Sequence, residues 1–172
     1  MAEMWSRLAR LRVPLGFAGS VLVLVLARPT WSLLAGGTLC AIVGESIRVW
    51  AAGHLEKSRE VTRSGPYRWS RHPLYVGSAL MGVGVVIAAN SAAVAAIMGL
   101  YLVITFSAAI RTEEAFLRAK FGPEYDEYCR GNVRAPDRTF SLARVWRNRE
   151  YRAVLGMGAV FAILALKALL SS

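Results

Sequence analysis

The chain has 172 residues, and 21 lysines and arginines against 11 acidic residues give it a formal net charge of +10. Hydrophobic residues make up 55% of it and only 19% of its residues are charged, fewer charges than an average soluble domain carries. Long apolar blocks exclude a disordered chain, a collagen and a coiled coil. Two cysteines exclude a disulfide framework, and with only two histidines we expect no metal site.

The apolar blocks are long enough to cross a membrane. The first two cover residues 13–27, which carry no charge, and residues 31–51, which are interrupted only by Glu45 and Arg48. A carboxylate inside a membrane helix is costly and therefore suggests a function. Arg48, one turn later, could instead neutralise Glu45 in a structural pair, and the sequence supports both interpretations equally.

The longest stretch without a charge covers residues 74–110. As one helix it would be about 55 Å long, nearly twice a hydrocarbon core of about 30 Å. It must therefore fold back, and Asn90-Ser91 is the polar pair near its middle. The sequence thus predicts an all-α polytopic membrane bundle, a single domain over residues 1–172, with about five transmembrane helices at 13–27, 31–51, 74–89, 91–110 and 152–170.

The cations predict the orientation of this bundle. They precede the first helix, fill the loop at 54–73, and ten more lie within residues 111–152, whereas the turn at 90–91 has none. By the positive-inside rule, the N-terminus and both long loops are cytoplasmic, in an inner or cytoplasmic membrane. Because this topology already explains the basic charge, we do not expect nucleic acid as a partner.

The first long loop ends in a distinctive run, Ser64-Gly65-Pro66-Tyr67-Arg68-Trp69-Ser70-Arg71-His72-Pro73-Leu74-Tyr75-Val76-Gly77. Pro73 suits the first position of a helix, whose N–H groups at 73–76 could bind a carboxylate. The tyrosine and tryptophan rings could stack on a ligand or face a cation. An interfacial belt of aromatic and basic residues is the structural alternative, but it does not explain the order of the residues.

The second long loop begins as a helix that continues from residues 91–110 and ends at Gly122-Pro123. This helix carries Glu113 and Glu114, and the hairpin at 90–91 brings it beside the first loop. Glu114 could form a surface ion pair with Arg118 one turn later. Two adjacent carboxylates at the membrane surface also suggest capture of a cationic or hydroxyl-bearing ligand.

Together these stretches resemble the isoprenylcysteine carboxyl methyltransferase and phospholipid methyltransferase family of membrane enzymes. The resemblance covers about residues 48–136 and is carried by four motifs: Ser64-Gly65-Pro66-Tyr67, Arg71-His72-Pro73-x-Tyr75-x-Gly77, Glu113-Glu114 and Phe121-Gly122-x-Glu124-Tyr125-x-x-Tyr128. It implies S-adenosylmethionine as methyl donor on the cytosolic side and a lipophilic acceptor, either an isoprenylcysteine-type carboxylate or a lipid amine, entering from the membrane.

The resemblance also implies which residues form the site. His72, Pro73, Leu74 and Tyr75 match the segment that holds the cofactor, Tyr67 matches a tyrosine lining its pocket, and Glu113 and Glu114 match an acidic pair. The isoprenylcysteine enzymes place a substrate arginine one turn before an acidic residue. Arg111 lies two residues from that position and fits it only in a shifted register. We therefore predict Glu113, Glu114 and Arg111 as the catalytic candidates, with Tyr128 as a further proton acceptor for an amine substrate.

Two other functions compete with a methyltransferase. Membrane reductases of the sterol reductase type use NADPH and carry a similar Arg-His-Pro-x-Tyr-x-Gly run, which this chain has at 71–77. A non-catalytic membrane scaffold would keep the helices without the activity. Binding of S-adenosylmethionine or of NADPH distinguishes these functions, and the sequence leaves the oligomeric state open.

Overall fold

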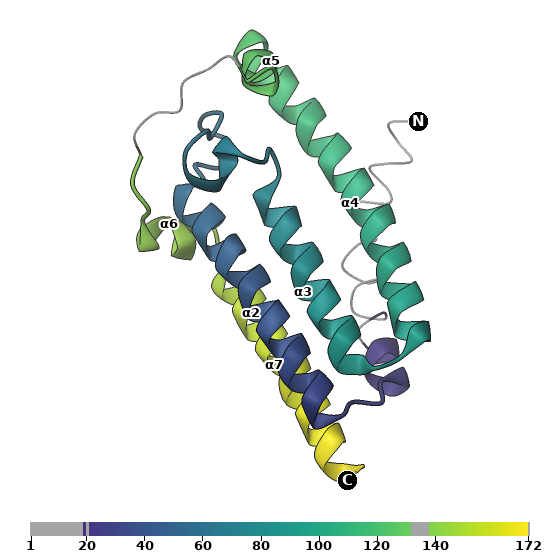
Figure 1. Cartoon of the computed structure of the whole chain (residues 1–172). Helices are drawn as coiled ribbons and strands as arrows, with labels where there is room; N and C mark the ends of the chain where they lie inside the picture. Colours follow the sequence, from purple (N-terminus) through teal and green to yellow (C-terminus); the bar gives the residue numbers. More distant parts are fainter. Residues whose placement is uncertain (1–18, 20, 132–137, 172) are drawn as a thin grey trace.

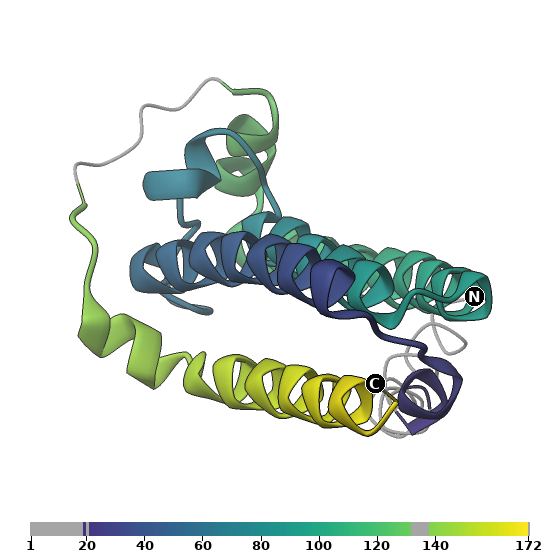
Figure 2. The same cartoon turned by 60° about the horizontal axis from the view of Figure 1, so that its bottom comes forward.

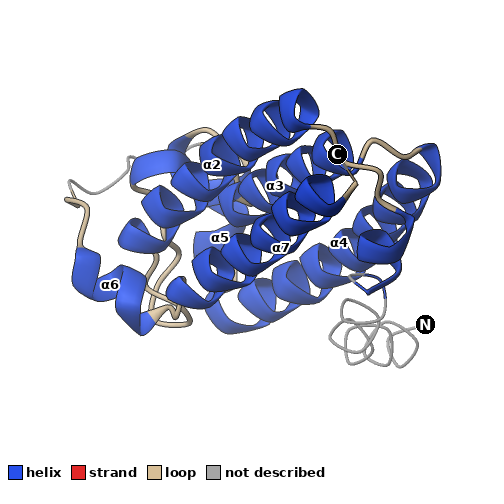
Figure 3. Ribbon diagram, turned by 90° about the horizontal axis from the view of Figure 1, so that it is seen from below, coloured by secondary structure: helices blue, strands red, loops and turns tan. Residues whose placement is uncertain are grey.

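All regular elements that the structure describes are helices, which confirms the all-α membrane bundle (Figure 3). The structure is a computed structural model that describes residues 19, 21–131 and 138–171. Its elements are α2 (Trp31–His54), the 3-10 helix η1 (Gly65–Arg68), α3 (Pro73–Ala89), α4 (Ala92–Phe121), α5 (Pro123–Cys129), α6 (Leu142–Arg147) and α7 (Tyr151–Leu170).

Three of these helices, α2, α4 and α7, are long and apolar enough to cross a membrane. The fourth, α3, is also apolar but has 17 residues, about 25 Å, which is somewhat less than a hydrocarbon core of about 30 Å. Residues 13–18 and 20 of the predicted first helix lie outside the described residues, and residues 21–26 are helical. The expected five membrane helices are thus represented by three long helices, one shorter helix and one that is only partly described.

The hairpin between α3 and α4 lies where the sequence predicted it. Asn90 ends α3 in the left-handed conformation, with φ 48° and ψ 49°, and the Ser91 hydroxyl accepts a hydrogen bond from the Val94 amide at the start of α4. As expected, α4 then runs unbroken to Phe121. Its 30 residues span about 45 Å, so the turns after Ile110, where charges begin, extend beyond the hydrocarbon core.

The closest packing in the bundle is between α2 and α3, and glycines make it possible. Gly37 and Gly44 of α2 lie against Gly84 and Gly77 of α3. A Cβ atom on Gly44 would come within 2.6 Å of the Gly77 carbonyl oxygen, and one on Gly84 within 2.5 Å of the Gly37 carbonyl oxygen. The backbones therefore touch, as in membrane helix pairs built on small residues.

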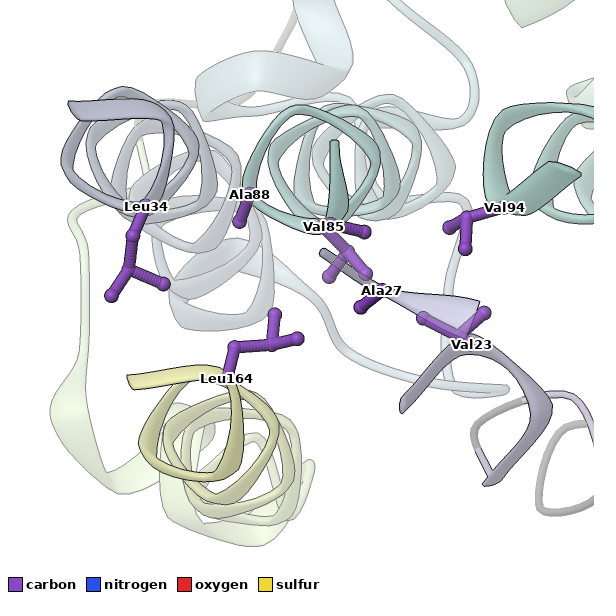
Figure 4. Packing of buried hydrophobic residues seen from close by; sticks show 8 residues of the cluster. Val23, Ala27, Leu34, Val85, Ala88, Val94 and Leu164 are labelled. Carbon is purple, nitrogen blue, oxygen red and sulfur yellow. The ribbon is translucent and has the colours of Figure 1, made fainter. Parts of the chain in front are cut away.

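The C-terminal helix α7 belongs to the core of the bundle. It runs beside α2 in a second layer, below α2 and α3 in Figure 2. Figure 4 shows Leu164 of α7 pointing toward Leu34 of α2 and Ala88 of α3, and all three side chains are buried. At the last turn, Lys167 Nζ donates to the carbonyls of Leu24 and Val25, each at 2.8 Å.

The two long charged segments gather at one end of the bundle, where η1, α5 and α6 lie in Figure 1. Ion pairs join them: the Arg63 guanidinium is 2.7 Å from Glu124 Oε1, and that of Arg138 is 2.5 Å from Glu60 Oε1. The turn at residues 90–91 and the C-terminal end of α7 lie at the opposite end (Figure 1). In the part of the chain that the structure describes, these ion pairs therefore lie at the same end of the bundle.

Candidate active site

The Gly-Pro turn holds Tyr67 inside the protein. Gly65 has a φ of +58°, and a Cβ atom there would meet the His54 ring at 2.5 Å, so glycine is required on both grounds. The buried Ser64 hydroxyl is hydrogen-bonded to His54 Nδ1 at 3.1 Å. These contacts fasten η1 to the end of α2 and leave the Tyr67 side chain only 8% exposed.

Tyr67 is also tied to the second charged segment, through Tyr128. The Tyr128 hydroxyl donates to the Tyr67 carbonyl oxygen at 2.8 Å. Burial raises the pKa of Tyr128 to about 12, and burial together with the negative charge of Glu113 raises the pKa of Tyr67 above its usual value. Both phenols are therefore protonated at neutral pH. Tyr128 acts as a hydrogen-bond donor between segments, which counts against its predicted use as a proton acceptor.

The helix α3 begins at Pro73, as the sequence predicted. Its first turn offers fewer N–H groups than expected, because proline has none and the amides of Tyr75 and Val76 both donate to the His72 carbonyl, at 3.0 and 3.2 Å. The His72 amide itself donates to the Ser70 hydroxyl at 3.2 Å. Of the amides at 73–76 that were expected to bind a carboxylate, only that of Leu74 remains.

The centre of the site is a contact between two motifs that are forty-two residues apart in sequence. His72 Nε2 lies 3.0 Å from Glu114 Oε1, which joins the start of α3 to α4. The guanidinium groups of Arg71 and Arg118 lie 3.6 and 3.7 Å from the same carboxylate. The hydrogen bond with His72 holds the pKa of Glu114 below its usual value, with the two arginines contributing, while burial opposes them. Glu114 is thus ionised at neutral pH.

Aromatic rings form one wall beside this contact. The ring of Tyr75 stands edge-on to His72, with centroids 5.9 Å apart, and edge-on to Phe106 of α4, at 5.2 Å. Aromatic faces and edges at this spacing can hold a flat ring or a cation. Leu74 is the remaining residue of the predicted cofactor segment. Its carbonyl oxygen accepts hydrogen bonds from the Ser78 hydroxyl at 2.9 Å and from the Arg48 guanidinium at 3.4 Å.

The other two catalytic candidates lie on the exposed side of α4. Glu113 and Arg111 are both exposed, whereas Glu114 is half-buried against His72. Glu113 nevertheless lies close enough to Tyr67 for its charge to raise the pKa of that phenol. The structure thus brings His72, Tyr75 and Glu114 together, places Glu113 near Tyr67, and leaves Arg111 on the outer surface of the helix.

Three residues in or near the site were not predicted from the sequence as site residues. Phe106 completes the aromatic wall, and Arg71, quoted only within a motif, contacts Glu114. Arg48 was considered only as a partner for Glu45, and the two are indeed 3.7 Å apart. Arg48 is closer to Glu150 at the start of α7, at 2.5 Å, and also contacts Ser78. A cation inside a membrane helix was the signal that could have identified it.

Comparison with known families supports the resemblance. The family model described as phospholipid methyltransferase matches residues 41–124, a stretch that contains the His72 and Glu114 motifs. No solved structure matches the chain.

The curated relatives of this chain include both metal resistance proteins and methyltransferases. The nickel-cobalt-cadmium resistance protein NccN of Alcaligenes xylosoxydans is 37% identical over 59% of this chain and 49% of its own length. The cobalt-zinc-cadmium resistance protein CzcN of Cupriavidus metallidurans is 40% identical over 55% of this chain and 43% of its own length. A probable protein-S-isoprenylcysteine O-methyltransferase of Oryza sativa is 34% identical over 57% of this chain and 58% of its own length.

The chain spans about half the length of the first two curated relatives. Resistance to metals is stated in the names of those two proteins and is not a finding about this chain. Within the described part of this chain, no group of three or more histidine, cysteine, aspartate or glutamate side chains is arranged to hold a metal ion.

Proposed function

The chain belongs, through residues 41–124, to the phospholipid methyltransferase family, and we propose that it is an integral membrane methyltransferase that uses S-adenosylmethionine. Its acceptor is a lipophilic molecule that enters from the membrane, with either an isoprenylcysteine-type carboxylate or a lipid amine as the group to be methylated. The observation that carries this proposal is the 3.0 Å contact between His72 and Glu114. It unites the Arg-His-Pro-x-Tyr and Glu-Glu motifs at one aromatic site.

The residues present fit this cofactor. S-Adenosylmethionine carries a sulfonium, an ammonium, a carboxylate, ribose hydroxyls and an adenine ring. The exposed carboxylate of Glu113 suits the ammonium or a ribose hydroxyl, and the rings of Tyr75 and Phe106, 5.2 Å apart, suit the sulfonium or the adenine. Arg71, whose guanidinium is half exposed, suits the carboxylate.

When bound, the cofactor would supply a methyl group already activated by its attachment to positive sulfur. The protein then has to place the acceptor in line with that group and exclude water, and such positioning alone is worth several kcal/mol. His72 and Glu114 would perform the first task by fixing α3 against α4, and the buried Tyr67 would close one side of the pocket. A carboxylate acceptor needs no general base, whereas an ammonium acceptor must first lose a proton.

The proposed site faces the cytoplasm. Its charged segments lie at the same end of the bundle (Figure 1), and this end carries nearly all of the cations outside the N-terminal segment. The positive-inside rule assigns such an end to the cytoplasmic side.

Calorimetric titration of the detergent-solubilised full chain tests the proposal. We expect micromolar binding of S-adenosylmethionine and of its demethylated product, no binding of NADPH, and at least a tenfold loss of cofactor affinity in His72→Ala. Glu127→Gln, which removes an exposed carboxylate on α5, is the matched control and should bind as wild type does.

The other outcomes are equally decisive. Binding of NADPH in place of S-adenosylmethionine would move the protein to the reductases. Binding of neither would support a scaffold, and unchanged affinity in His72→Ala would remove this residue from the site.

A further inference from the structure

Arg48 lies at the junction of three helices. It belongs to α2, and its guanidinium is 2.5 Å from the carboxylate of Glu150, the residue before α7, and 3.4 Å from the Leu74 carbonyl oxygen in the first turn of α3. It also donates to the Ser78 hydroxyl, one turn further along α3. A planar guanidinium with several donors can serve these partners at once. Arg48 therefore connects α7 to the start of α3.

The sequence of α3 makes room for this side chain. A Cβ atom on Gly77 would come within 2.5 Å of the Arg48 Cγ atom and within 3.2 Å of the Arg48 amide nitrogen. Gly77 is the last residue of the run Arg71-His72-Pro73-x-Tyr75-x-Gly77. The glycine of this motif therefore lets the stem of Arg48 pass beside α3 and reach its first turn.

Two carboxylates contact Arg48, and the contacts differ in strength. Glu150 lies 2.5 Å from one guanidinium nitrogen, whereas Glu45, on α2 itself, lies 3.7 Å from another. Glu150 is only 5% exposed, so its charge has little access to water. In an ion pair this close and this buried, loss of one partner leaves the other as an unpaired buried charge. Glu150 is therefore the partner that fixes the position of the Arg48 guanidinium.

The turn that carries Glu150 is itself fastened to α2. The Asn148 side chain donates to the carbonyls of Ala52 and Leu55, at 2.9 and 3.0 Å. Ala52 lies in the last turn of α2, and Leu55 follows this helix directly. The Glu150 carboxylate is thus presented to Arg48 from a turn with a defined position.

The charges of this pair also reach Tyr67. Burial does most to raise the pKa of the Tyr67 phenol, followed by the neighbouring groups Glu113 and Tyr128. Of the two members of the pair, Glu150 raises this pKa further and Arg48 lowers it. The pair therefore lies near two parts of the candidate site, the buried phenol of η1 and the first turn of α3.

We propose that Glu150 is a positioning residue of the candidate site. It holds Arg48 against the first turn of α3, and Arg48 in turn holds the Leu74 carbonyl. The cofactor segment at 72–75 thereby keeps the position in which it binds S-adenosylmethionine. This inference rests on the proposed methyltransferase function. It extends the site beyond the family match, which ends at residue 124, to the segment before α7.

Two amide variants beside the same guanidinium test this proposal, with hydrogen–deuterium exchange of the detergent-solubilised full chain, without cofactor, as the first measurement. Glu150→Gln removes the close partner of Arg48, and exchange at residues 74–78 should become at least tenfold faster. Glu45→Gln makes the same chemical change at the more distant partner. It is the matched control, and exchange at 74–78 should stay as in wild type. Exchange at the far end of α3, residues 84–89, should change in neither variant.

Calorimetric titration with S-adenosylmethionine is the second measurement. Glu150→Gln should lose at least tenfold of its affinity, and Glu45→Gln should bind as wild type does. Leu164→Ala separates positioning from a general loss of stability, because Leu164 of α7 lies toward Ala88 at the far end of α3 (Figure 4). This variant should destabilise the bundle and keep its affinity for the cofactor.

A second variant guards against misfolding of Glu150→Gln. Arg48→Lys keeps a positive charge beside the carboxylates, but a single ammonium group cannot reproduce the contacts of a guanidinium with both Glu150 and the Leu74 carbonyl. It should also speed exchange at residues 74–78 and weaken binding of S-adenosylmethionine.

Several outcomes would overturn the proposal. Unchanged exchange at residues 74–78 in Glu150→Gln and Arg48→Lys is one, and faster exchange with wild-type affinity is another. Equal effects of Glu150→Gln and Glu45→Gln, or an equal loss of affinity in Leu164→Ala, would reduce Glu150 to a general stabilising residue. A wild-type chain that binds no S-adenosylmethionine would overturn the proposed function instead. In that case exchange at 74–78, which needs no cofactor, supports or overturns the role of Glu150 by itself.

Discussion

Glu113 and Glu114 are consecutive in sequence, yet they have different surroundings. Successive residues of a helix point about 100° apart, so only Glu114 faces α3 and contacts His72, at 3.0 Å. Glu113 is exposed beside Tyr67. We therefore propose that Glu114 holds the site together and that Glu113 contacts the cofactor.

This division predicts different results for the two amide variants. Glu114→Gln removes a charge that binds His72, Arg71 and Arg118, and it should lower both the melting temperature and the cofactor affinity. Glu113→Gln should lower cofactor affinity or turnover at least tenfold, about 1.4 kcal/mol, and leave the melting temperature within error. Thermal unfolding and calorimetry on the same preparations measure both quantities, and a destabilised Glu113→Gln that binds normally would reverse the assignment.

At the scale of the elements, the pair formed by α2 and α3 determines where the site residues can be. The backbones of these helices touch at Gly37 and Gly84 and again at Gly44 and Gly77. The first turn of α3, which carries Pro73 and Leu74, is therefore held at a defined height beside α2, where Arg48 reaches the Leu74 carbonyl.

Two adjacent glycines of α2 provide a matched test of this packing. A Cβ atom on Gly37 would come within 2.8 Å of the Ala88 amide nitrogen, whereas one on Gly36 would have its nearest neighbour, a methyl group of Ile87, at 4.0 Å. Gly37→Ala should therefore lower the free energy of unfolding by about 1–3 kcal/mol, the usual effect of overpacking. Gly36→Ala should be neutral or slightly stabilising.

Denaturant unfolding of the two variants in the same detergent measures this difference. Equal stabilities would show that the helices can move apart at little cost, and the close approach of α2 and α3 would then not govern the position of the site.

At the scale of the whole molecule, α7 links the end of the bundle that carries the site to the opposite end. Glu150, just before α7, pairs with Arg48 of α2, and Lys167 near its other end binds the carbonyls of Leu24 and Val25. The family match ends at residue 124, so this helix lies outside the matched stretch and still contributes to the core.

The contribution of α7 can be measured with two leucines of this helix. Leu164 is fully buried against α2 and α3, whereas Leu166 is 55% exposed. Leu164→Ala should cost about 2–5 kcal/mol of unfolding free energy, because it leaves a cavity in the core, and Leu166→Ala should change little.

Chemical unfolding of these variants, together with a chain truncated after Arg149, tests the role of the helix. We expect the truncated chain to lose both stability and cofactor binding. Retention of full stability in Leu164→Ala or in the truncated chain would show that α7 is an accessory to a self-sufficient bundle.

By itself, the sequence determined the helical class, the hairpin at residues 90–91, the start of α3 at Pro73 and the run of α4 to Phe121. These features follow from local signals: apolar length, a polar turn, a proline at the first helical position, and glycine-proline at an end. The motifs at 64–77 and 113–114 likewise supplied the candidate residues of the site, because the side-chain types on which its chemistry depends can be read directly, and their roles stay predictions.

Only the tertiary structure decided how these residues are paired. Arg48 could be expected to neutralise Glu45, but its stronger contact is with Glu150, about a hundred residues later. Tyr128 was a possible proton acceptor, but its hydroxyl donates to the Tyr67 carbonyl. Such partners are chosen by the packing of helices that are distant in sequence. No local pattern specifies that packing, because it depends on which faces can approach most closely, here the glycine faces of α2 and α3.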